Sequence, residues 1–395
     1  MLDNKGIRQL CYAVKVINIT PIEGADRVEL AHVNGWQVMV KKGEYKIGDL
    51  AVYFEIDSKL PETEPFEFMS KYKYRVKTQK FIKGSVLSQG LIMTPAELGL
   101  KDVKEGDFLT DKLGVTYYEA EDNIRKADNK KLAELKADKF MEKWAKEHKF
   151  LFRFAFIRKW RRKKFLKKYF AKQKKTGSGG FPNQFPYIHK SDEERIENIP
   201  EILKDKEPWI KTLKIDGTSS TYILERIKRN KKFEFYVVSR NVRQETPDQK
   251  CYHDSNVYWD MAFKYHIKDF LKEQLILHPN WKYVCIQGET AGVGVQGNPH
   301  KLKDTQFFGF NFIDPEKGRW NSIEAKNYVA KWGIQWVPII DEHYILPDTL
   351  EEMKATADGQ CELEGSTGLR EGYVYRDLQG QKSFKNVSNQ YLMSK

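Results

Sequence analysis

The sequence predicts an α+β fold, with an all-β portion towards the N-terminus and a mixed portion towards the C-terminus. Three observations support this prediction. Short apolar runs separated by Asn, Asp and Gly fill residues 9–113. Residues 119–175 are rich in Lys, Ala, Glu and Arg, which favour helices. From residue 191 onward, runs of strand length alternate with helical patterns.

The N-terminal portion, residues 1–115, is predicted to be a small β-barrel. Its expected strands cover residues 12–19, 36–40, 51–56 and 86–93, and turn-forming pieces such as Asn34-Gly35 separate them. Short strands at close spacing fit an OB-like barrel, a fold that often binds nucleic acid. Size and spacing alone allow an SH3-like barrel equally well.

The middle portion, residues 116–180, is predicted to be a basic, mainly helical insert or linker. Phenylalanines at positions 150, 152, 154 and 156 alternate as in a strand, but the composition favours a helix. Residues 158–175 hold eleven Lys and Arg residues and no Asp or Glu, in a chain whose net charge is +13. Attraction for phosphate groups is therefore concentrated there, with a solvated linker as the alternative. The glycine-rich stretch 176–180 predicts a flexible joint.

The C-terminal portion, residues 181–395, is predicted to alternate strands and helices. A capping-box pattern at Ser191 predicts a short helix that includes Arg195. Further helices are expected at residues 254–275, 322–332 and 349–356, and strands at 212–225, 232–239, 282–289, 306–313, 372–376 and 382–387. The strands at 212–225 and 232–239 are expected to pair.

Composition argues against several classes of protein. The four cysteines have no paired spacing, so neither a disulfide framework nor a zinc site is indicated. Eight histidines lie without metal-ligand spacing. The first residues lack the pattern of a secretory signal, and no apolar run approaches the roughly 18 residues that a membrane span needs. We therefore expect a cytoplasmic protein with no membrane partner.

The stretch Lys214-Ile215-Asp216-Gly217-Thr218 places an amine beside a carboxylate and a glycine turn. A lysine in this setting can attack the α-phosphate of a nucleotide and hold the nucleotide as a phosphoramide, which is covalent catalysis by an amine. The alternative is a surface strand that ends in an Asp-Gly turn. The order of the motifs that follow favours the catalytic interpretation.

Five further patterns follow this lysine in order: Ser239-Arg240-Asn241, Gln287-Gly288-Glu289, Phe307-Phe308-Gly309-Phe310, Glu371-Gly372-Tyr373-Val374 and Lys382-Ser383-Phe384-Lys385. The series resembles the successive nucleotidyltransferase motifs of the covalent ligase and mRNA-capping superfamily. Residues 181–186 and 192–195, together with 24–28 and 57–60, are similar to the ATP-dependent branch that carries an N-terminal OB domain, the family five RNA ligases. The resemblance implies a ligase-type or capping-type nucleotidyltransferase domain over residues 181–395.

This resemblance implies an ATP-dependent RNA ligase. Lys214 would attack the α-phosphate of ATP to form lysyl-AMP, AMP would pass to an RNA 5′-phosphate, and a 3′-hydroxyl would then displace AMP. The implied substrate is RNA with 3′-OH and 5′-phosphate ends, such as a nicked duplex. Lys214 must be neutral to attack, which requires about 4 kcal/mol of differential stabilisation of the free amine near neutral pH. Positive charge on Lys382, Lys385 and a divalent cation is expected to supply it.

Three carboxylates from separate strands, Asp216, Glu289 and Glu371, are predicted to converge on one cavity. Hard oxygen ligands suit Mg²⁺ or Mn²⁺, held here through water. Each carboxylate alone could equally be an exposed residue at the end of a strand, but their order among the other motifs favours a metal role. By resemblance, Glu289 also accepts a hydrogen bond from the ribose, and Gly217 belongs to the nucleotide-binding turn.

The remaining predicted nucleotide contacts are an aromatic ring and two guanidinium groups. Phe310 is expected to share a strand face with the aromatic residues two positions before and after it, so its ring could stack on the adenine. Core packing is the alternative for this ring. Arg195 and Arg240 suit phosphate or ribose oxygens, although Arg195 could be a helix-surface residue.

Two other functions stay open. A GTP-dependent capping-type enzyme would label Lys214 with GTP instead of ATP. A nucleic-acid-binding protein with a vestigial site would have a broken motif, yet Lys214, Glu289, Glu371 and Lys385 are all present. DNA ligases and capping enzymes carry a further domain after the last lysine motif, whereas ten residues follow Lys385 here, and this favours the RNA ligase branch.

Overall fold

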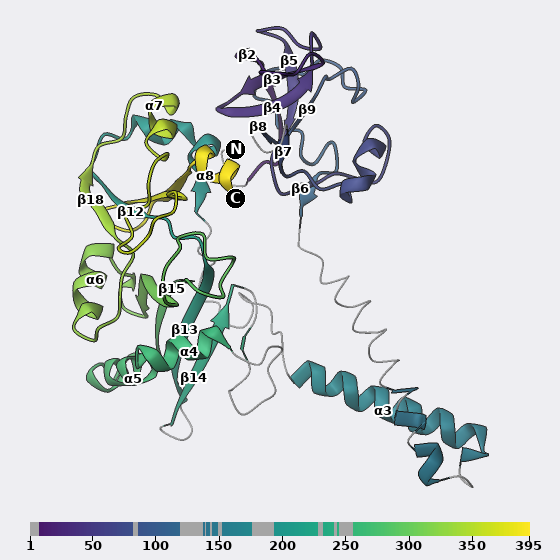
Figure 1. Cartoon of the computed structure of the whole chain (residues 1–395), viewed down its shortest axis with the longest axis vertical. Helices are drawn as coiled ribbons and strands as arrows, with labels where there is room; N and C mark the ends of the chain where they lie inside the picture. The colour runs from purple at the N-terminus through teal and green to yellow at the C-terminus, as the bar shows by residue number, and fades with distance from the viewer. Residues whose placement is uncertain are drawn as a thin grey trace. The chain divides into compact units, whose positions relative to one another are not determined.

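The computed structural model describes residues 8–81, 86–118, 137–138, 140–142, 144–148, 152–175, 193–227, 232–240, 243–244 and 256–395, with the backbone alone for 168–175. The chain forms two compact units (Figure 1). The first comprises Met1–Tyr118, Ser191–Val237 and Ser255–Lys395, and the second comprises Glu119–Lys190 and Val238–Asp254. The domain boundaries after residues 115 and 180 stay predictions.

The N-terminal portion is built from short strands, as predicted. They are β1 (Cys11–Lys15), β2 (Asn18–Pro21), β3 (Val28–Val33), β4 (Trp36–Lys41), β5 (Leu50–Phe54), β6 (Ser58–Lys59), β7 (Thr78–Phe81), β8 (Val86–Gln89), β9 (Leu91–Met93) and β10 (Thr116–Tyr117), with a 3₁₀ helix η1 (Glu67–Tyr72). Their hydrogen bonds form the sheets β1-β5-β9, β2-β3-β4, β7-β8 and β10-β6, so pairing among the described residues does not run as one closed barrel.

Strands β1 and β5 are buried on both faces because two hydrophobic clusters use alternate side chains. Tyr12 and Tyr53 pack with Trp36 of β4 in one cluster. Cys11 and Phe54, which point the other way, belong to the second cluster. This alternation follows from the two-residue period of a strand. It places the sheet β1-β5-β9 in the centre of the N-terminal portion.

The C-terminal portion holds two five-stranded sheets. The first sheet has the order β11-β20-β19-β12-β18 and the second has the order β14-β13-β15-β16-β17. Their strands are β11 (Glu194–Arg195), β12 (Trp209–Leu213), β13 (Thr218–Ile227), β14 (Lys232–Ser239), β15 (Tyr283–Ala291), β16 (Gln306–Asp314), β17 (Gly318–Arg319), β18 (Ile339–Tyr344), β19 (Gly372–Asp377) and β20 (Ser383–Val387). The strand predicted over 212–225 is therefore two strands, and they belong to different sheets.

Helices pack on both sheets of the C-terminal portion. They are α4 (Val257–Lys264), α5 (Ile267–Leu277), α6 (Ser322–Ala330), α7 (Leu350–Ala355) and α8 (Asn389–Ser394), with 3₁₀ helices η3 (Ile196–Asn198) and η4 (Pro200–Lys204). Helix α5 packs on β13 and β15, and α6 packs on β16 (Figure 1). Helix α7 packs on β20 of the first sheet. The single helix predicted over 254–275 is wrong over its described part, because His266 adopts a left-handed conformation (φ 48°) between α4 and α5.

Two helices of the C-terminal portion begin at residues whose side chains cap the helix. At the start of α7, the Thr349 hydroxyl oxygen accepts a hydrogen bond from the Glu352 backbone N–H, and the Glu352 carboxylate accepts one from the Thr349 backbone N–H. The two bonds form a complete capping box. Asn321 caps α6, and Gly333 follows that helix with φ +69°. The predicted helices at 322–332 and 349–356 are thus confirmed, with ends within a few residues of those expected.

Contacts within the first unit join its N-terminal strands to its C-terminal strands and helices. The Lys354 Nζ donates a hydrogen bond to the Gly35 carbonyl oxygen. The Arg195 guanidinium lies 5.7 Å from the centre of the Trp36 ring. Gln89 at the end of β8 donates to the Asn389 side chain at the start of α8 over 3.3 Å. The last helix is therefore held between the two portions.

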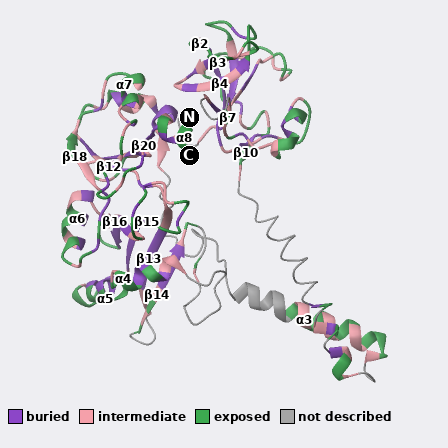
Figure 2. Ribbon diagram, viewed as in Figure 1, coloured by how far each residue is buried: buried purple, intermediate pink, exposed green. Residues whose placement is uncertain are grey.

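The second unit contains the long helix α3 (Ala155–Lys175) and helical turns between residues 137 and 147. The helix predicted for this basic segment is confirmed over α3, and the strand-like alternation of the phenylalanines does not form a strand at residues 152–156. Figure 2 shows exposed and half-buried residues alternating along the described part of α3. In the part of the chain that the structure describes, no helix combines the length and apolar content needed to cross a membrane.

Candidate active site

Lys214 lies where the chain passes from the first sheet to the second. Strand β12 ends at Leu213, strand β13 begins at Thr218, and the four residues between them carry the predicted nucleophile. The Lys214 backbone N–H donates to the Gly372 carbonyl oxygen over 3.0 Å. At Gly217 a Cβ atom would lie 2.2 Å from the Thr290 carbonyl oxygen, so only glycine fits there.

The Lys214 amine forms a short ion pair with Glu371, the residue just before β19. The Nζ to Oε1 distance is 2.6 Å, and both side chains are largely shielded from water. Burial alone would lower the pKa of the Lys214 amine, but the charges of Glu371, Glu289 and Asp216 outweigh it and raise the pKa. The amine is therefore held protonated in this arrangement, opposite to the lowered pKa that a nucleophile needs.

Glu289 reaches the same cluster from β15, where it pairs across the sheet with Ser219 of β13. Burial raises the pKa of its carboxyl group to about 8, an effect that Lys214 counteracts and that the other two carboxylates strengthen. The Gly217 backbone N–H also donates to it. Three acidic groups and one lysine are thus close enough to influence one another's ionisation.

Asp216 is held by two side chains from the end of the chain. The Tyr391 hydroxyl and the Lys395 amine both donate to its Oδ2 atom. Burial tends to raise the pKa of Asp216, but these two donors and the nearby Lys214 lower it overall. Asp216 is therefore ionised, with a lysine already serving as its counter-ion.

A buried histidine holds the backbone of the same motif. His300 has no exposed surface, and its Nε2 accepts the Asp216 backbone N–H over 2.8 Å. Because Nε2 is an acceptor, the neutral ring carries its proton on Nδ1, which faces the Cys361 sulfur at 3.5 Å. Burial lowers the pKa of His300, which favours this neutral form.

Tyr391, Lys395 and His300 were not predicted from the sequence. None has a spacing that indicates a site, because their partner Asp216 lies between 84 and 179 residues away along the chain. The one available signal was the polar tail after the last lysine motif, Ser388-Asn389-Gln390, which predicts a capped helix start. Its contact with Asp216 arises only in the folded protein.

The donor set fits a hard divalent cation, although the described residues form no ready cluster of three His, Cys, Asp or Glu side chains around one point. Buried Glu371 Oε2 has no hydrogen-bond partner in the structure. A buried carboxylate oxygen without a partner is costly and fits a missing cation or water. The predicted metal role of Asp216, Glu289 and Glu371, held through water, stays a prediction.

Arg195 and Lys385 lie on one row across the first sheet. Arg195 of β11 pairs with Lys385 of β20, Lys385 pairs with Val374 of β19, and Val374 pairs with Thr212 of β12. Directly paired residues project to the same face of a sheet. Lys214 follows Thr212 by two positions, which is one full strand period. Its side chain is therefore expected on the same face of the sheet as Arg195 and Lys385.

The helix predicted to include Arg195 is wrong at that residue. Arg195 is in strand β11 and immediately precedes η3. Parallel pairing with β20 overrides the local capping pattern, and Ser191 itself lies outside the described residues. The buried Nη1 atom of Arg195 has no hydrogen-bond partner in the structure, as suits a group that binds an anion.

Lys382 pairs with Asp205 instead of approaching Lys214. Its amine lies 3.1 Å from the Asp205 Oδ2 atom, and most of its side chain is exposed. Backbone and side-chain hydrogen bonds, the second from Lys382, lower the pKa of Asp205. The predicted lowering of the Lys214 pKa by Lys382 is therefore absent from this arrangement.

Phe310 sits at a bulge in β16. Gln287 of β15 pairs with Asn311, but the next residue, Gly288, pairs with Gly309, so Phe310 is the extra residue. The expected alternation with Phe308 and Phe312 is interrupted there. Those two rings are buried, whereas Phe310 is half-buried and lies beside Arg376. The Phe310 ring packs at the margin of the hydrophobic core of the C-terminal portion, where the bulge interrupts the regular alternation.

Comparison with known proteins places this geometry in a family. The profile of the RNA ligase family matches residues 207–388, which hold Lys214, Glu289 and Glu371. Residues 207–388 belong to the RNA ligase family. A profile described as an OB-fold domain matches residues 10–95, in agreement with the predicted α+β chain with an N-terminal OB-like portion.

Solved structures of an RNA ligase from Naegleria gruberi resemble nearly the whole chain. A mutant with ATP and Mn is 28% identical, with 98% of this chain and 99% of that chain covered and a TM-score of 0.65. A mutant with AMP and Mn has the same identity, coverage and TM-score. The protein with PPi is 28% identical, with the same coverage and a TM-score of 0.64. Among curated proteins, the comparison found no match.

The fold brings four of the predicted residues, Asp216, Gly217, Glu289 and Glu371, close to the predicted nucleophile Lys214. Lys385 and Arg195 lie on one sheet row, Phe310 lies at the bulge, and Lys382 pairs elsewhere. Arg240 is exposed just past β14 and stays a sequence-based prediction.

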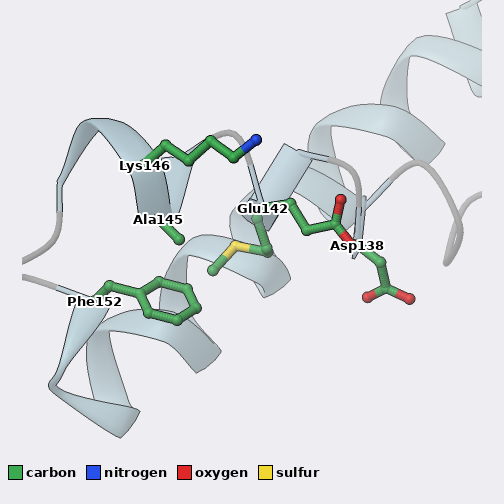
Figure 3. Close-up of a pocket in the computed structure, with 6 residues that line it drawn as sticks. Asp138, Glu142, Ala145, Lys146 and Phe152 are labelled. Atoms are coloured by element: carbon green, nitrogen blue, oxygen red, sulfur yellow. The ribbon is translucent and has the colours of Figure 1, made fainter.

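A separate pocket lies in the second unit, outside the RNA ligase domain (Figure 3). Its lining residues are Asp138, Met141, Glu142, Ala145, Lys146 and Phe152. None of these residues belongs to the ligase motifs, so the pocket gives no support to the RNA ligase function.

Proposed function

We propose that the chain is an ATP-dependent RNA ligase that joins 3′-OH and 5′-phosphate RNA ends through a covalent lysyl-AMP intermediate. The observation that carries the proposal is the position of Lys214 among Asp216, Glu289 and Glu371 at the junction of two sheets. The RNA ligase family match and the likeness to a Naegleria gruberi RNA ligase that was solved with ATP and Mn add support.

The first step forms a phosphorus–nitrogen bond. The Lys214 Nζ lone pair attacks the α-phosphorus of ATP, the bond from that phosphorus to the bridging oxygen breaks, and pyrophosphate leaves. Nζ must first lose a proton, and Glu371 Oε1, 2.6 Å away, is placed to receive it. Weakening the Lys214–Glu371 ion pair is therefore part of activation.

The next two steps return the lysine and seal the strand. An oxygen of the RNA 5′-phosphate attacks the phosphorus of lysyl-AMP, the phosphorus–nitrogen bond breaks, and AMP is left on the RNA end. The RNA 3′-hydroxyl then attacks the 5′-phosphate and AMP leaves. Lys385 and Arg195, on one row of the first sheet, are the cations suited to the phosphate groups.

The metal suited to this site is Mg²⁺ or Mn²⁺, held by Asp216, Glu289 and Glu371 through water. It would supply positive charge to the phosphates and to the leaving pyrophosphate. The positive charge of Lys395 already balances the negative charge of Asp216, and that of Lys214 balances Glu371. The two lysines and the cation therefore compete for the same carboxylates.

The test is covalent labelling. The protein is incubated with α-labelled ATP and Mn²⁺ or Mg²⁺, and the covalent adduct is located by mass spectrometry without prolonged acid treatment, because a phosphorus–nitrogen bond hydrolyses in acid. We expect one AMP on Lys214, absent in Lys214→Arg and unchanged in the control Lys204→Ala, an exposed lysine. Labelling by GTP but not ATP would favour a capping-type enzyme, and no labelling with either would overturn the proposal.

The substrate is tested with the labelled protein. The AMP should move to the 5′-phosphate end of a nicked RNA duplex, and the nick should then be sealed. An RNA that lacks the 5′-phosphate is the matched control and should leave the label on the protein. Equal sealing of an all-DNA nick would contradict the RNA preference.

A further inference from the structure

Helix α3 has two faces of different character. Residues 157, 158, 161, 162, 165 and 166 are half-buried, whereas 156, 159, 160, 163, 164 and 167 are exposed. The half-buried face packs on the helical turns between residues 137 and 147. Phe165 stacks on Phe140 with ring centres 4.6 Å apart, and Arg162 pairs with Asp138 over 2.9 Å. One face is thus structural, and the other is open to solvent.

The exposed face combines two aromatic rings with four lysines. Phe156 and Trp160 are one helical turn apart and are 71% and 56% exposed. Lys159, Lys163, Lys164 and Lys167 make up the rest of this face. The Lys164 amine lies 4.9 Å from the centre of the Trp160 ring. We call these six residues the α3 outer face.

Holding four like charges on one helix face without acidic neighbours is unfavourable. Pairs of like charge at this spacing each destabilise a helix by about 0.2–0.5 kcal/mol. The sequence continues the pattern with Lys168, Lys172, Lys174 and Lys175 and offers no Asp or Glu over residues 155–175. The two aromatic side chains beside these charges are 71% and 56% exposed, so they bury little apolar surface in the folded chain. Both features are explained by a ligand that is anionic and has flat, stackable groups.

We propose that the α3 outer face binds the phosphate backbone of RNA, with an unpaired base stacking on Trp160 or Phe156. The inference rests on the proposed RNA ligase function for the identity of the polymer. Lysines bind backbone phosphates without reading sequence and release condensed counter-ions. An exposed ring stacks on any base. The face therefore holds the RNA substrate and takes no part in the chemistry at Lys214.

An anionic membrane surface is the competing occupant of a basic helix with aromatic residues. A helix that lies in a membrane interface needs a wide apolar stripe opposite its charges. In α3 the large aliphatic residues with described side chains, Ile157 and Leu166, are on the half-buried face. The outer face has lysines on both sides of its two rings. These features favour a polyanion over a lipid surface.

The test uses the full chain with Lys159, Lys163, Lys164 and Lys167 each changed to Gln. Affinity for a labelled RNA with an unpaired segment is measured from about 50 to 300 mM KCl. The slope of log affinity against log salt should become shallower by about 2.8 to 3.6 if each of the four lysines contacts one phosphate, because roughly 0.7 to 0.9 counter-ions are released for each phosphate contact. Affinity at 100 mM KCl should fall about tenfold or more.

A charge-matched control separates this surface from general basicity. Lys268, Lys272, Lys326 and Lys331 are exposed lysines on or just after helices of the first unit. Changing these four to Gln removes the same net charge and should alter the salt slope by less than about 1. An equal change in both quadruple variants would overturn the proposal.

The aromatic residues are tested with Trp160→Ala in the full chain. Stacking of one base predicts a loss of affinity between roughly fivefold and a hundredfold for RNA with unpaired bases, with an unchanged salt slope. No loss with any RNA would overturn the stacking part. Helix content by circular dichroism should equal that of the unchanged protein.

Vesicles and adenylylation complete the test. Vesicles that contain phosphatidylserine should not retain the protein in competition with RNA, and retention that the lysine changes abolish, without a change in RNA affinity, would overturn the proposal. ATP labelling of Lys214 should be the same in all these variants. A protein that binds RNA through the α3 outer face but is never labelled would refute the ligase function and leave this surface standing.

Discussion

The active-site cluster and the α3 outer face use positive charge in opposite ways. In the cluster, the Lys214 and Lys395 amines each contact a carboxylate, and both carboxylates are largely buried. On the outer face, the lysines are exposed and lie beside one another. A buried amine needs a counter-charge because desolvation is costly, whereas water screens exposed charges. A lysine in an ion pair can become a nucleophile once that ion pair is broken. Exposed lysines without carboxylate partners on their own helix are suited to binding a polyanion.

The largest effect should come from the nucleophile itself. Lys214→Arg keeps a cation near Glu371 but cannot form the phosphoramide, so adenylylation should fall by more than about a thousandfold. The salt slope of RNA binding should not change, which separates the two regions. Adduct formation is measured by mass spectrometry. A labelled Lys214→Arg protein would show that another residue is the nucleophile.

The next effect tests the close approach of strands at the cluster. An Ala side chain at position 217 would collide with the Thr290 carbonyl oxygen, so Gly217→Ala should lower the free energy of unfolding by about 1–3 kcal/mol. Misplacing Lys214 and Asp216 should also slow adenylylation by about a hundredfold. Gly333→Ala is a comparison variant, because φ is positive there and no atom lies within 4 Å, whereas Gly217 has a close contact without a positive φ. Gly333→Ala should therefore leave adenylylation unchanged, and an unchanged stability and rate in Gly217→Ala would contradict the collision.

A smaller effect is expected at the counter-ion of Asp216. The Lys395 side chain is 47% exposed, so its ion pair is worth at most about 1 kcal/mol. Lys395→Gln should therefore lower the Mn²⁺ concentration for half-maximal adenylylation by about two- to fivefold, because the cation no longer displaces an amine. Lys331→Gln, on the exposed surface, should leave it unchanged. A higher requirement for Mn²⁺ in Lys395→Gln would mean that Lys395 assists cation binding.

The smallest effect should come from one lysine of the α3 outer face. Lys164→Gln should weaken RNA binding by about two- to fivefold and reduce the salt slope by about 0.9. Adenylylation should stay at its original rate. The measurement is a salt titration of RNA affinity beside ATP labelling of the same sample. Loss of labelling in Lys164→Gln would show that the α3 outer face also contributes to adenylylation of Lys214, in contradiction of the proposed division of roles.

Most strands and helices of the C-terminal portion could be predicted because their signals are local. The strand predicted at 232–239 has the same bounds as β14, and the helix predicted at 349–356 corresponds to α7. The errors occur where a contact distant in sequence overrides the local pattern. Arg195 carries a helix-start pattern, yet pairing with β20 makes it a strand residue. His266 interrupts a continuous helical pattern with a left-handed turn.

The bulge at Phe310 shows what a strand pattern omits. Periodicity predicts that alternate residues share a face, and it carries no information on an extra residue in one of two paired strands. The register of β15 against β16 decides where that residue lies. The prediction of Phe310 as the base-stacking ring came from the family resemblance, and its half-buried position at the bulge agrees with such a role.

By itself, the sequence determined the α+β class, the OB-like portion, the order of the nucleotidyltransferase motifs and the concentration of positive charge near residues 158–175. The fold class and the concentration of charge depend on composition and periodicity, which are local, whereas the OB-like portion and the order of the motifs were identified by resemblance to a family. Only the tertiary structure decided that Tyr391, Lys395 and His300 hold Asp216. It also decided which lysines of α3 face solvent. Such contacts depend on packing between elements far apart in the chain, and no local pattern encodes that packing.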